Sequence, residues 1–299
     1  IRDRGYPKQF AANMLLAKVY MTLATNPNLR ADGVSEMDYW QLAYDQAMHV
    51  YGQYSLVPDY SSLFTDTNEN SSESIWELQI SQVAANSQMG RNYTPWKYKL
   101  GQHFGWSKVR SAVYDFHAYI YPNDPRIEAT YLSSWVRADN GNPVNVYPSN
   151  PNRNSWFNSH PYHFKFTEKD TQHNNQYNDQ NLIIYRYGEL LIMLAEISNE
   201  LDNGQQLGFV TELLNRVGMS PQGAYYGTQD EFREAIIDLK VEELKNLIID
   251  LRGNPGGYLL PAKQIADDFL EAKKAIVIVE GNNGKRERTV SSSEGLFEA

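Results

Sequence analysis

Two stretches near the start of the chain carry apolar residues at helical spacing. In residues 8–24 the apolar stripe consists of Phe10, Met14, Ala17 and Met21. In residues 36–51 it consists of Met37, Trp40, Tyr44, Ala47 and Tyr51. Ser35 precedes the second stretch as a plausible N-cap, and Asn26-Pro27 and Asp32-Gly33 are turn signals in the connection. The pattern predicts a helical hairpin that packs aromatic against aliphatic side chains.

A second helical hairpin is predicted over residues 185–217. The apolar face of its first helix consists of Tyr187, Leu190, Leu191, Leu194 and Ile197. Gly204 lies where helices typically end, and the second helix runs to about Val217. The apolar positions of that helix are Phe209, Leu213 and Leu214. Two helical hairpins of similar size indicate a tetratricopeptide-like array, although the full repeat motif is missing.

The stretch between the hairpins, residues 53–181, is rich in Asn, Ser, Pro, Gly and Tyr. Residues 74–80 alternate in polarity as a strand does. The rest is predicted to be ordered loop with short elements, because its aromatic content is too high for disorder. Long loops inside compact domains are usually functional, so a binding site is expected here.

The pattern changes from about residue 240. Residues 247–251 and 275–279 are short, apolar and β-branched like buried strands, and residues 261–272 between them have helical spacing. This order predicts a βαβ unit, followed by a polar tail with no evident partner. The predicted fold is therefore mainly α: tetratricopeptide-like helical hairpins with long irregular loops in residues 1–238, then a small incomplete α/β segment in residues 239–299.

Composition narrows the range of functions. The net charge of −9 and the pI near 5.2 argue against binding of nucleic acid, which needs a basic surface. The chain has no cysteine, which excludes disulfides, thiolate metal sites and a cysteine nucleophile. No apolar run reaches the roughly 18 residues of a membrane-spanning helix. The first ten residues lack the apolar stretch of a signal peptide, as in a cytosolic protein or in a mature or truncated form.

Aromatic residues are abundant, with 21 Tyr, 6 Trp and 11 Phe. Many lie among Asn and other polar residues, as in residues 92–106 (NYTPWKYKLGQHFGW). A ring in such surroundings offers a flat apolar face with a polar rim, which suits stacking on sugars. Packing beneath long loops is the alternative for each ring.

The order of several segments resembles the SusD/RagB family of surface glycan-binding lipoproteins from Bacteroidetes. The matching segments are AANMLLAKVYMTLA (11–24), YSLVPDYSSLF (54–64), ENSSESIWELQ (69–79), NDPRIEATYL (123–132) and YRYGELLIMLAEISNEL (185–201). The resemblance covers about residues 1–237. It implies a helical tetratricopeptide scaffold without catalysis, located on the outer membrane at the cell surface. It also implies a partner, a TonB-dependent transporter of the SusC type that receives oligosaccharides.

Glycan contacts in that family come mainly from loop aromatics and polar side chains, and the resemblance places them after the strand of residues 74–80. The expected substrate-binding residues are Arg91, Asn92, Tyr93, Trp96, Tyr98, His103 and Trp106. Trp106 has a structural alternative, because a Gly-Trp pair recurs in the family. No cofactor is expected.

Two features depart from the family. The lipid-bearing cysteine at the amino terminus is absent, as are helices expected before residue 1. After residues 230–238 (DEFREAIID) the family's arginine-rich helix and closing segment are replaced by LKVEELKNLIIDLRGNPGG. The change near residues 237–240 has the form of a join between two genes, either natural or artificial.

The replacing segment, residues 247–270, resembles the C-terminal processing (tail-specific) serine peptidases. In that family a glycine amide of the DLRGNPGG turn helps to form the oxyanion hole, and Gly256 or Gly257 matches that position. The alternative is a strand-to-helix turn that requires positive φ. The family's serine and lysine lie beyond the matched stretch, and Ser291, Ser292 and Ser293 have no evident base beside them. Hydrolysis by this chain alone is therefore not expected.

Other polar clusters have simpler explanations. His160 and His163, with Asp170 and His173, could suggest a metal site, but their spacing fits no metal motif and polar loop histidines are favoured. Asp124 is expected to cap a turn. Glu189 and Glu196 are expected to pair with Arg186.

The leading function is non-catalytic capture of oligosaccharide for uptake. A serine peptidase and a protein–protein scaffold are the alternatives.

Overall fold

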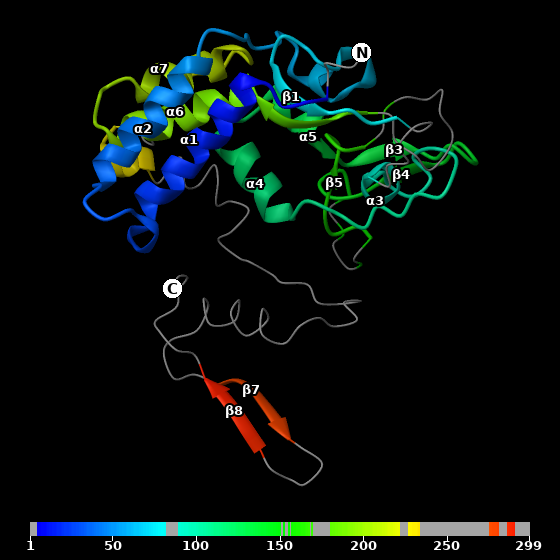
Figure 1. Cartoon of the computed structure of the whole chain (residues 1–299). Coiled ribbons are helices and arrows are strands. Elements are labelled where there is room, and N and C mark those ends of the chain that lie inside the picture. The colour runs from blue at the N-terminus through cyan, green and yellow to red at the C-terminus, as the bar shows by residue number, and fades with distance from the viewer. Residues whose placement is uncertain are drawn as a thin grey trace. The chain divides into compact units, whose positions relative to one another are not determined.

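A computed structural model describes residues 5–81, 89–150, 152, 155, 157–167, 169, 180–221, 227–233, 275–280 and 286–290 (Figure 1). The chain divides into two compact units, Ile1–Lys245 and Asn246–Ala299, which are treated separately below. The domain boundary at residue 238 stays a prediction.

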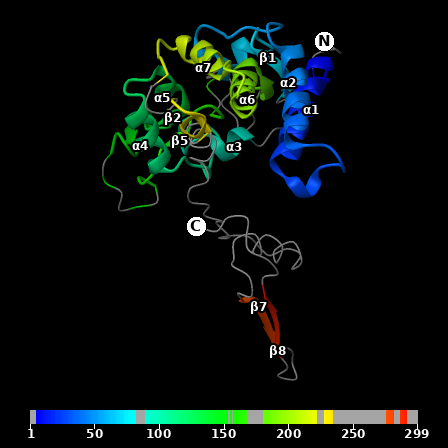
Figure 2. The same cartoon turned by 90° about the vertical axis from the view of Figure 1, so that its left-hand side faces the viewer.

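The first unit is built on two helical hairpins. Their helices are α1 (Gln9–Thr25), α2 (Glu36–Val50), α6 (Tyr187–Glu200) and α7 (Gln206–Asn215). Helix α1 packs on α2, α2 on α6, and α6 on α7, so the four helices form one array although the chain between the hairpins is long (Figures 1 and 2). This arrangement confirms the mainly α prediction and the two hairpins.

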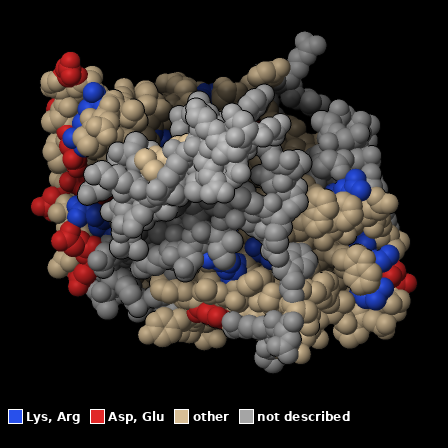
Figure 3. All heavy atoms as spheres, turned by 90° about the horizontal axis from the view of Figure 1, so that it is seen from below, with Lys and Arg blue, Asp and Glu red and all other residues tan. Residues whose placement is uncertain are grey.

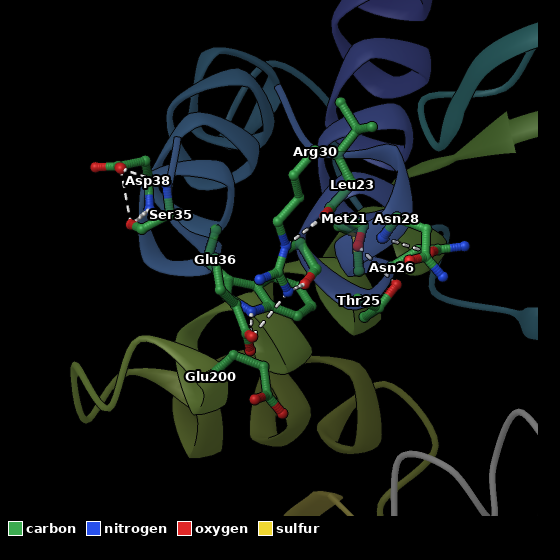
Figure 4. Close-up of polar contacts among 12 residues, drawn as sticks. Met21, Leu23, Thr25, Asn26, Asn28, Arg30, Ser35, Glu36, Asp38 and Glu200 are labelled. Carbon is green, nitrogen blue, oxygen red and sulfur yellow. Dashed lines mark hydrogen bonds and ion pairs between the residues drawn. The ribbon is translucent and has the colours of Figure 1, made fainter. Parts of the chain in front are cut away.

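The ends of these helices follow their sequence signals. Ser35 and Asp38 form a capping box at the start of α2, in which the Ser35 hydroxyl accepts from the Asp38 N–H at 3.2 Å (Figure 4). Arg30 follows the end of α1, where its Nε donates to the Leu23 carbonyl at 3.1 Å and its Nη2 to Glu36 at 2.8 Å (Figure 4). Gly204 adopts φ +76° between α6 and α7. Each connection is thus fixed by local chemistry.

The main core lies among these four helices. The predicted stripes of α6 and α7 are fully buried, and in α1 Met14, Ala17 and Met21 are buried with Phe10 packed at the edge. Met37 is an exception, since its side chain is 48% exposed. It lies in the first turn of α2 and faces solvent, so its predicted core position is wrong.

A buried carboxylate joins the second hairpin to the long middle stretch. Strand β1 (Ser74–Leu78) pairs antiparallel with β6 (Leu182–Arg186), which confirms the predicted strand. Glu73, just before β1, is fully buried and contacts Arg186 at 2.6 Å and Arg216 at 2.8 Å. Its Oε2 also accepts from the Val57 N–H at 3.0 Å. We call these four residues the Glu73 cluster.

The predicted pairing of Arg186 with Glu189 is wrong. Glu189 contacts Lys18 of α1 at 2.5 Å, whereas Arg186 points to Glu73. Helical proximity suggested the pair, but the buried Glu73 carboxylate takes the Arg186 guanidinium instead.

The middle stretch contains short elements, as predicted. They are η1 (Pro27–Leu29) in the first hairpin, and then η2 (Tyr60–Phe64), η3 (Asp66–Asn68), α3 (Met89–Tyr93), α4 (Ser111–Ile120), α5 (Pro125–Thr130), β2 (Tyr131–Leu132), β3 (Ser134–Val136), β4 (Pro143–Asn145) and β5 (Tyr162–His163). Strand β2 pairs with β5, and β3 with β4, both antiparallel. Asp124 caps α5 by accepting from the Arg126 N–H at 2.8 Å, as expected, and its carboxylate also contacts His117 at 3.0 Å. A small core of Leu132, Trp135, Val146 and Tyr162 holds this part together.

In the second unit the structure describes one hairpin. Strand β7 (Ala275–Glu280) confirms the predicted strand and pairs antiparallel with β8 (Arg286–Val290). The prediction that the polar tail has no partner is therefore wrong for residues 286–290, because a strand that contains three charged residues can still pair through its backbone. Residues 247–251 and 261–272 of the predicted βαβ unit lie outside the described residues.

Candidate functional site

The segment of residues 91–106 lies on the small core, and two backbone hydrogen bonds fold it back on itself. The Phe104 N–H donates to the Arg91 carbonyl, and the Trp106 N–H donates to the Asn92 carbonyl, both at 2.9 Å. Phe104 and Trp106 are two positions apart, and the chain between them turns at Gly105.

The rings of Phe104 and Trp106 are stacked. Their centroids are 4.6 Å apart and their planes differ by 7°. The Arg91 guanidinium carbon lies 4.5 Å from the Phe104 centroid, and Arg91 Nη2 donates to the Gln102 side chain at 2.9 Å. Trp106 is 66% exposed. The result is a braced aromatic surface in contact with solvent, since a cation over a ring face stabilises the stack.

Gly105 makes this stack possible. Its φ is +54°, which side chains other than glycine rarely adopt. A Cβ at this position would lie 3.0 Å from Pro95 Cα and would overlap the Tyr162 ring. The glycine therefore allows the stacked pair to sit directly on the small core.

Trp96 forms a second exposed ring, with 42% of its surface accessible. The Arg137 guanidinium carbon lies 4.3 Å from the Trp96 centroid, and Asp139 holds Arg137 through two hydrogen bonds of 2.9 and 2.8 Å. The Trp135 Nε1–H donates to the Trp96 carbonyl at 3.3 Å. The turn between β3 and β4 thus braces this ring as Arg91 braces Phe104.

The backbone segments that carry the two exposed rings lie close together. Pro95 precedes Trp96, Gly105 precedes Trp106, and the contact between Pro95 and Gly105 limits the separation of the two tryptophan Cα atoms to about 12 Å. We call Arg91, Trp96, Phe104, Trp106 and Arg137 the aromatic platform. Such a platform can stack on flat apolar faces and donate hydrogen bonds at their edges.

The other sequence-predicted site residues have different positions. The Tyr93 ring packs against Phe166 and His163, with centroids at 4.9 and 5.8 Å. Tyr98 packs edge-on against Phe164 as part of the small core. His103 is only 3% exposed, so its ring lies in the interior of the loop rather than on its surface. These three side chains are placed to support the platform.

Asn92 is half-buried, and its backbone carbonyl accepts the hydrogen bond from the Trp106 N–H. Sequence reasoning missed Phe104 and Arg137. The two-residue spacing of aromatics in FGW was a signal for Phe104, whereas Arg137 is distant in sequence and had none.

Buried titratable groups lie beneath the platform. Burial lowers the pKa of His163 to about 4, with Lys165 acting in the same direction. Burial also lowers the pKa of Lys108 to about 8, and the Lys108 ammonium donates to the Phe157 carbonyl at 2.6 Å. Both groups favour their neutral forms more than they would in water.

The histidines of the possible metal site have other contacts. His160 Nδ1 accepts from the Ser111 N–H at 3.0 Å, and His163 is packed among aromatic rings. Among the described residues no three acidic or histidine side chains are grouped as metal ligands. Asp170 and His173 lie outside these residues.

Two cavities lie elsewhere in the first unit. One, of about 390 Å³, is at the ends of α1, α2 and α6, where Glu36 and Glu200 line it and are paired with Arg30 and Arg233 (Figure 4). The other, of about 310 Å³, lies along β6 beside Lys165 and Glu189. Neither presents an exposed ring stack.

The peptidase-like positions cannot be placed. Gly256, Gly257 and the serines at 291–293 lie outside the described residues. Over the residues that are described, no helix has the length and apolarity needed to cross a membrane.

A sequence profile of the SusD family matches residues 24–242. The chain belongs to the SusD family. It is similar in structure to a SusD superfamily protein from Parabacteroides distasonis, with 19% identity, a TM-score of 0.62, and 81% of this chain and 50% of that chain covered. It is also similar to surface glycan-binding protein A from Bacteroides thetaiotaomicron in complex with laminarihexaose, with 18% identity, a TM-score of 0.58, and 89% and 63% covered. The chain thus spans about half of the first of these structures.

A profile of Peptidase family S41 matches residues 215–297, which overlaps the SusD match. Carboxy-terminal processing protease CtpB from Bacillus subtilis is 34% identical over 65 residues, which are 22% of this chain and 14% of that protein. CtpA from the same organism is 40% identical over 60 residues, or 20% and 13%. The chain therefore matches only about a seventh of the length of these proteases. Both family resemblances in the sequence are confirmed.

Proposed function

We propose that the first unit binds oligosaccharide without catalysis, and that the aromatic platform makes the contacts. The observation that carries this proposal is the exposed Phe104–Trp106 stack, braced by Arg91 and adjacent to Trp96. Contiguous exposed apolar surface marks ligand-binding grooves more often than scattered single side chains do. A sugar ring has an apolar face that fits such a surface and hydroxyls that fit its polar rim.

Membership in the SusD family supports a binding rather than a catalytic role. Among the similar structures, one is a complex with laminarihexaose and another a complex with a xylogluco-oligosaccharide. By the same reasoning we place the protein at the cell surface on the outer membrane, where it would pass its ligand to a TonB-dependent transporter of the SusC type. The roles of Arg91, Asn92, Trp96 and Trp106 as ligand contacts belong to this proposal.

The test is affinity electrophoresis of the full chain through native gels that contain a panel of polysaccharides. We expect one or more polysaccharides to slow the protein. Trp106→Ala and Trp96→Ala each remove one ring and should weaken binding about fivefold, because a ring contact contributes about 1 kcal/mol. Tyr119→Ala is the matched control, since Tyr119 on α4 is 76% exposed and lies outside the platform.

The outcomes separate the alternatives. Migration that no polysaccharide slows would contradict glycan binding and favour a peptide-binding or scaffold role. Equal weakening by the tryptophan and Tyr119 variants would show that the platform is not the site.

The S41 match supports one rival, a serine peptidase activity. A fluorophosphonate probe should leave the chain unlabelled if the protein only binds, whereas labelling of one of Ser291, Ser292 and Ser293 would establish a nucleophile.

A further inference from the structure

Apart from Arg137, the residues of the platform lie in a segment whose net charge is positive, opposite in sign to that of the whole protein. The chain has 36 acidic residues and a net charge of −9, yet residues 79–114 contain no Asp or Glu. The same segment contains five basic residues, which are Arg91, Lys97, Lys99, Lys108 and Arg110. A local excess of one sign against the net charge is an electrostatic feature that acts on ligands.

The platform itself carries more positive than negative charge. Arg91 contacts the neutral Gln102 side chain and the Phe104 ring. At Trp96 two cations share one carboxylate, since Asp139 contacts Arg137 at 2.8 Å and Lys97 at 3.5 Å. Among the described residues, the cations beside the exposed rings thus outnumber the carboxylates that contact them.

The surface view is consistent with this distribution. In Figure 3 most of the acidic groups lie on the side of α1 and α2, whereas Lys and Arg predominate on the side of α3, β3 and β4. On the face drawn in Figure 3, the side that carries α3, β3 and β4 is thus less negative than the side of α1 and α2.

We propose that the ligand of the aromatic platform is an anionic polysaccharide, whose carboxylate or sulfate groups pair with Arg91 and with the Arg137–Lys97 pair. This inference rests on the proposed glycan binding and specifies its substrate class. The rings hold the sugar faces and the cations hold the charged substituents, because a guanidinium donates charge-assisted hydrogen bonds to planar carboxylates and to sulfates. A neutral glycan would gain only the stacking.

The experiment compares matched pairs of polysaccharides that differ in charge. De-esterified and fully methyl-esterified homogalacturonan share one backbone, and dextran sulfate and dextran share another. We expect the full chain to be retained about tenfold more strongly by at least one charged member than by its neutral partner. Which pair responds identifies the anion as carboxylate or sulfate. Retention should fall between about 50 and about 300 mM NaCl, since salt screens exposed charges.

Variants connect the effect to the platform. Arg91→Gln should reduce binding of the charged polymer about tenfold, whereas Arg91→Lys should retain more of it. Lys8→Gln is the control, because it makes the same change in net charge at an exposed residue at the start of α1, outside the platform. A protein with net charge −9 is repelled by polyanions in general, so retention requires a local site.

Three results would overturn the inference. Equal retention by the charged and neutral members, without salt dependence, would refute the anionic ligand but leave glycan binding standing. Absence of retention by every polysaccharide would refute both. Equal loss of charged-polymer binding in Lys8→Gln and Arg91→Gln would show that net charge rather than the platform is responsible, and would also refute it.

Discussion

The Glu73 cluster yields the sharpest test of how the first unit is held together. Glu73 has no exposed side-chain surface, and Arg216 has 3%, so both charges are removed from water and depend on each other. Burial lowers the pKa of the Arg216 guanidinium, while the charge of Glu73 acts in the opposite direction. Replacing Glu73 by glutamine keeps the size of the side chain but leaves Arg216 buried beside a neutral group.

The expected loss is large for a single substitution. Breaking a buried ion pair from one side costs about 3–5 kcal/mol, because an uncompensated charge stays in the interior. The glutamine amide would in addition present N–H donors to a site where the Val57 N–H and Arg186 already donate. For a unit of this size each kcal/mol lowers the midpoint of thermal unfolding by about 2–4 °C, so Glu73→Gln should lower that midpoint by about 6–20 °C.

The assay is urea unfolding of the full chain followed by tryptophan fluorescence. All six tryptophans precede residue 157, so the signal reports the first unit alone. Glu189→Gln is the matched control: it also removes a glutamate from an ion pair, but Glu189 and Lys18 are 33% and 39% exposed. Exposed pairs contribute at most about 1 kcal/mol, so the control should be nearly as stable as the parent. Similar free energies of unfolding for the two variants would refute the reasoning.

Three further predictions concern the glycine beside this cluster, a helix cap and a buried histidine. Gly188→Ala should lower the free energy of unfolding by about 2 kcal/mol or more in the same urea assay, because its Cβ would overlap the Arg186 guanidinium; a neutral effect would mean that Arg186 can move at no cost. Ser35→Ala should cost about 1 kcal/mol through loss of the capping box with Asp38, and Ser35→Asp should restore most of it; equal stability of the two variants would contradict the cap. The pKa of His163 is about 4 in the folded protein and near 6.5 in the unfolded chain. The contribution of neutral His163 to the free energy of unfolding is therefore fully present above pH 6.5 and is lost as the pH falls through 4. Urea unfolding at several pH values should show that the free energy of unfolding falls by up to about 3 kcal/mol over that window, and His163→Phe should reduce this fall. The same pH profile in the variant and in the parent protein would contradict the role of His163.

The sequence by itself determined the helical hairpins. Their stripes repeat every three or four residues, and their ends are marked by Ser35 and Gly204, so local periodicity and capping chemistry were sufficient. The same held for β1, whose residues alternate in polarity, and for β7, which is a short apolar run. The two family resemblances also required only ordered segments of sequence, and both are confirmed.

Local patterns were less informative where a neighbour in space decides whether a side chain is buried or a strand is paired. Met37 has helical spacing but is exposed, whereas Trp40, one turn further along α2, is buried, so periodicity alone did not decide which positions pack. The polarity of residues 286–290 concealed a strand, because backbone pairing does not require apolar side chains on both faces.

Only the tertiary structure decided which aromatics form a surface. Tyr93, Tyr98, His103 and Trp106 are equally plausible in sequence, but packing on the small core turns the first three inward and leaves Trp106 exposed. Arg137 reaches Trp96 from a hairpin about 40 residues away in sequence, and Glu73 reaches Arg216 over a still longer distance. Helical and strand periodicity arise from contacts a few residues apart, whereas a binding surface and a buried ion pair join distant segments, and their geometry exists only after the chain has packed.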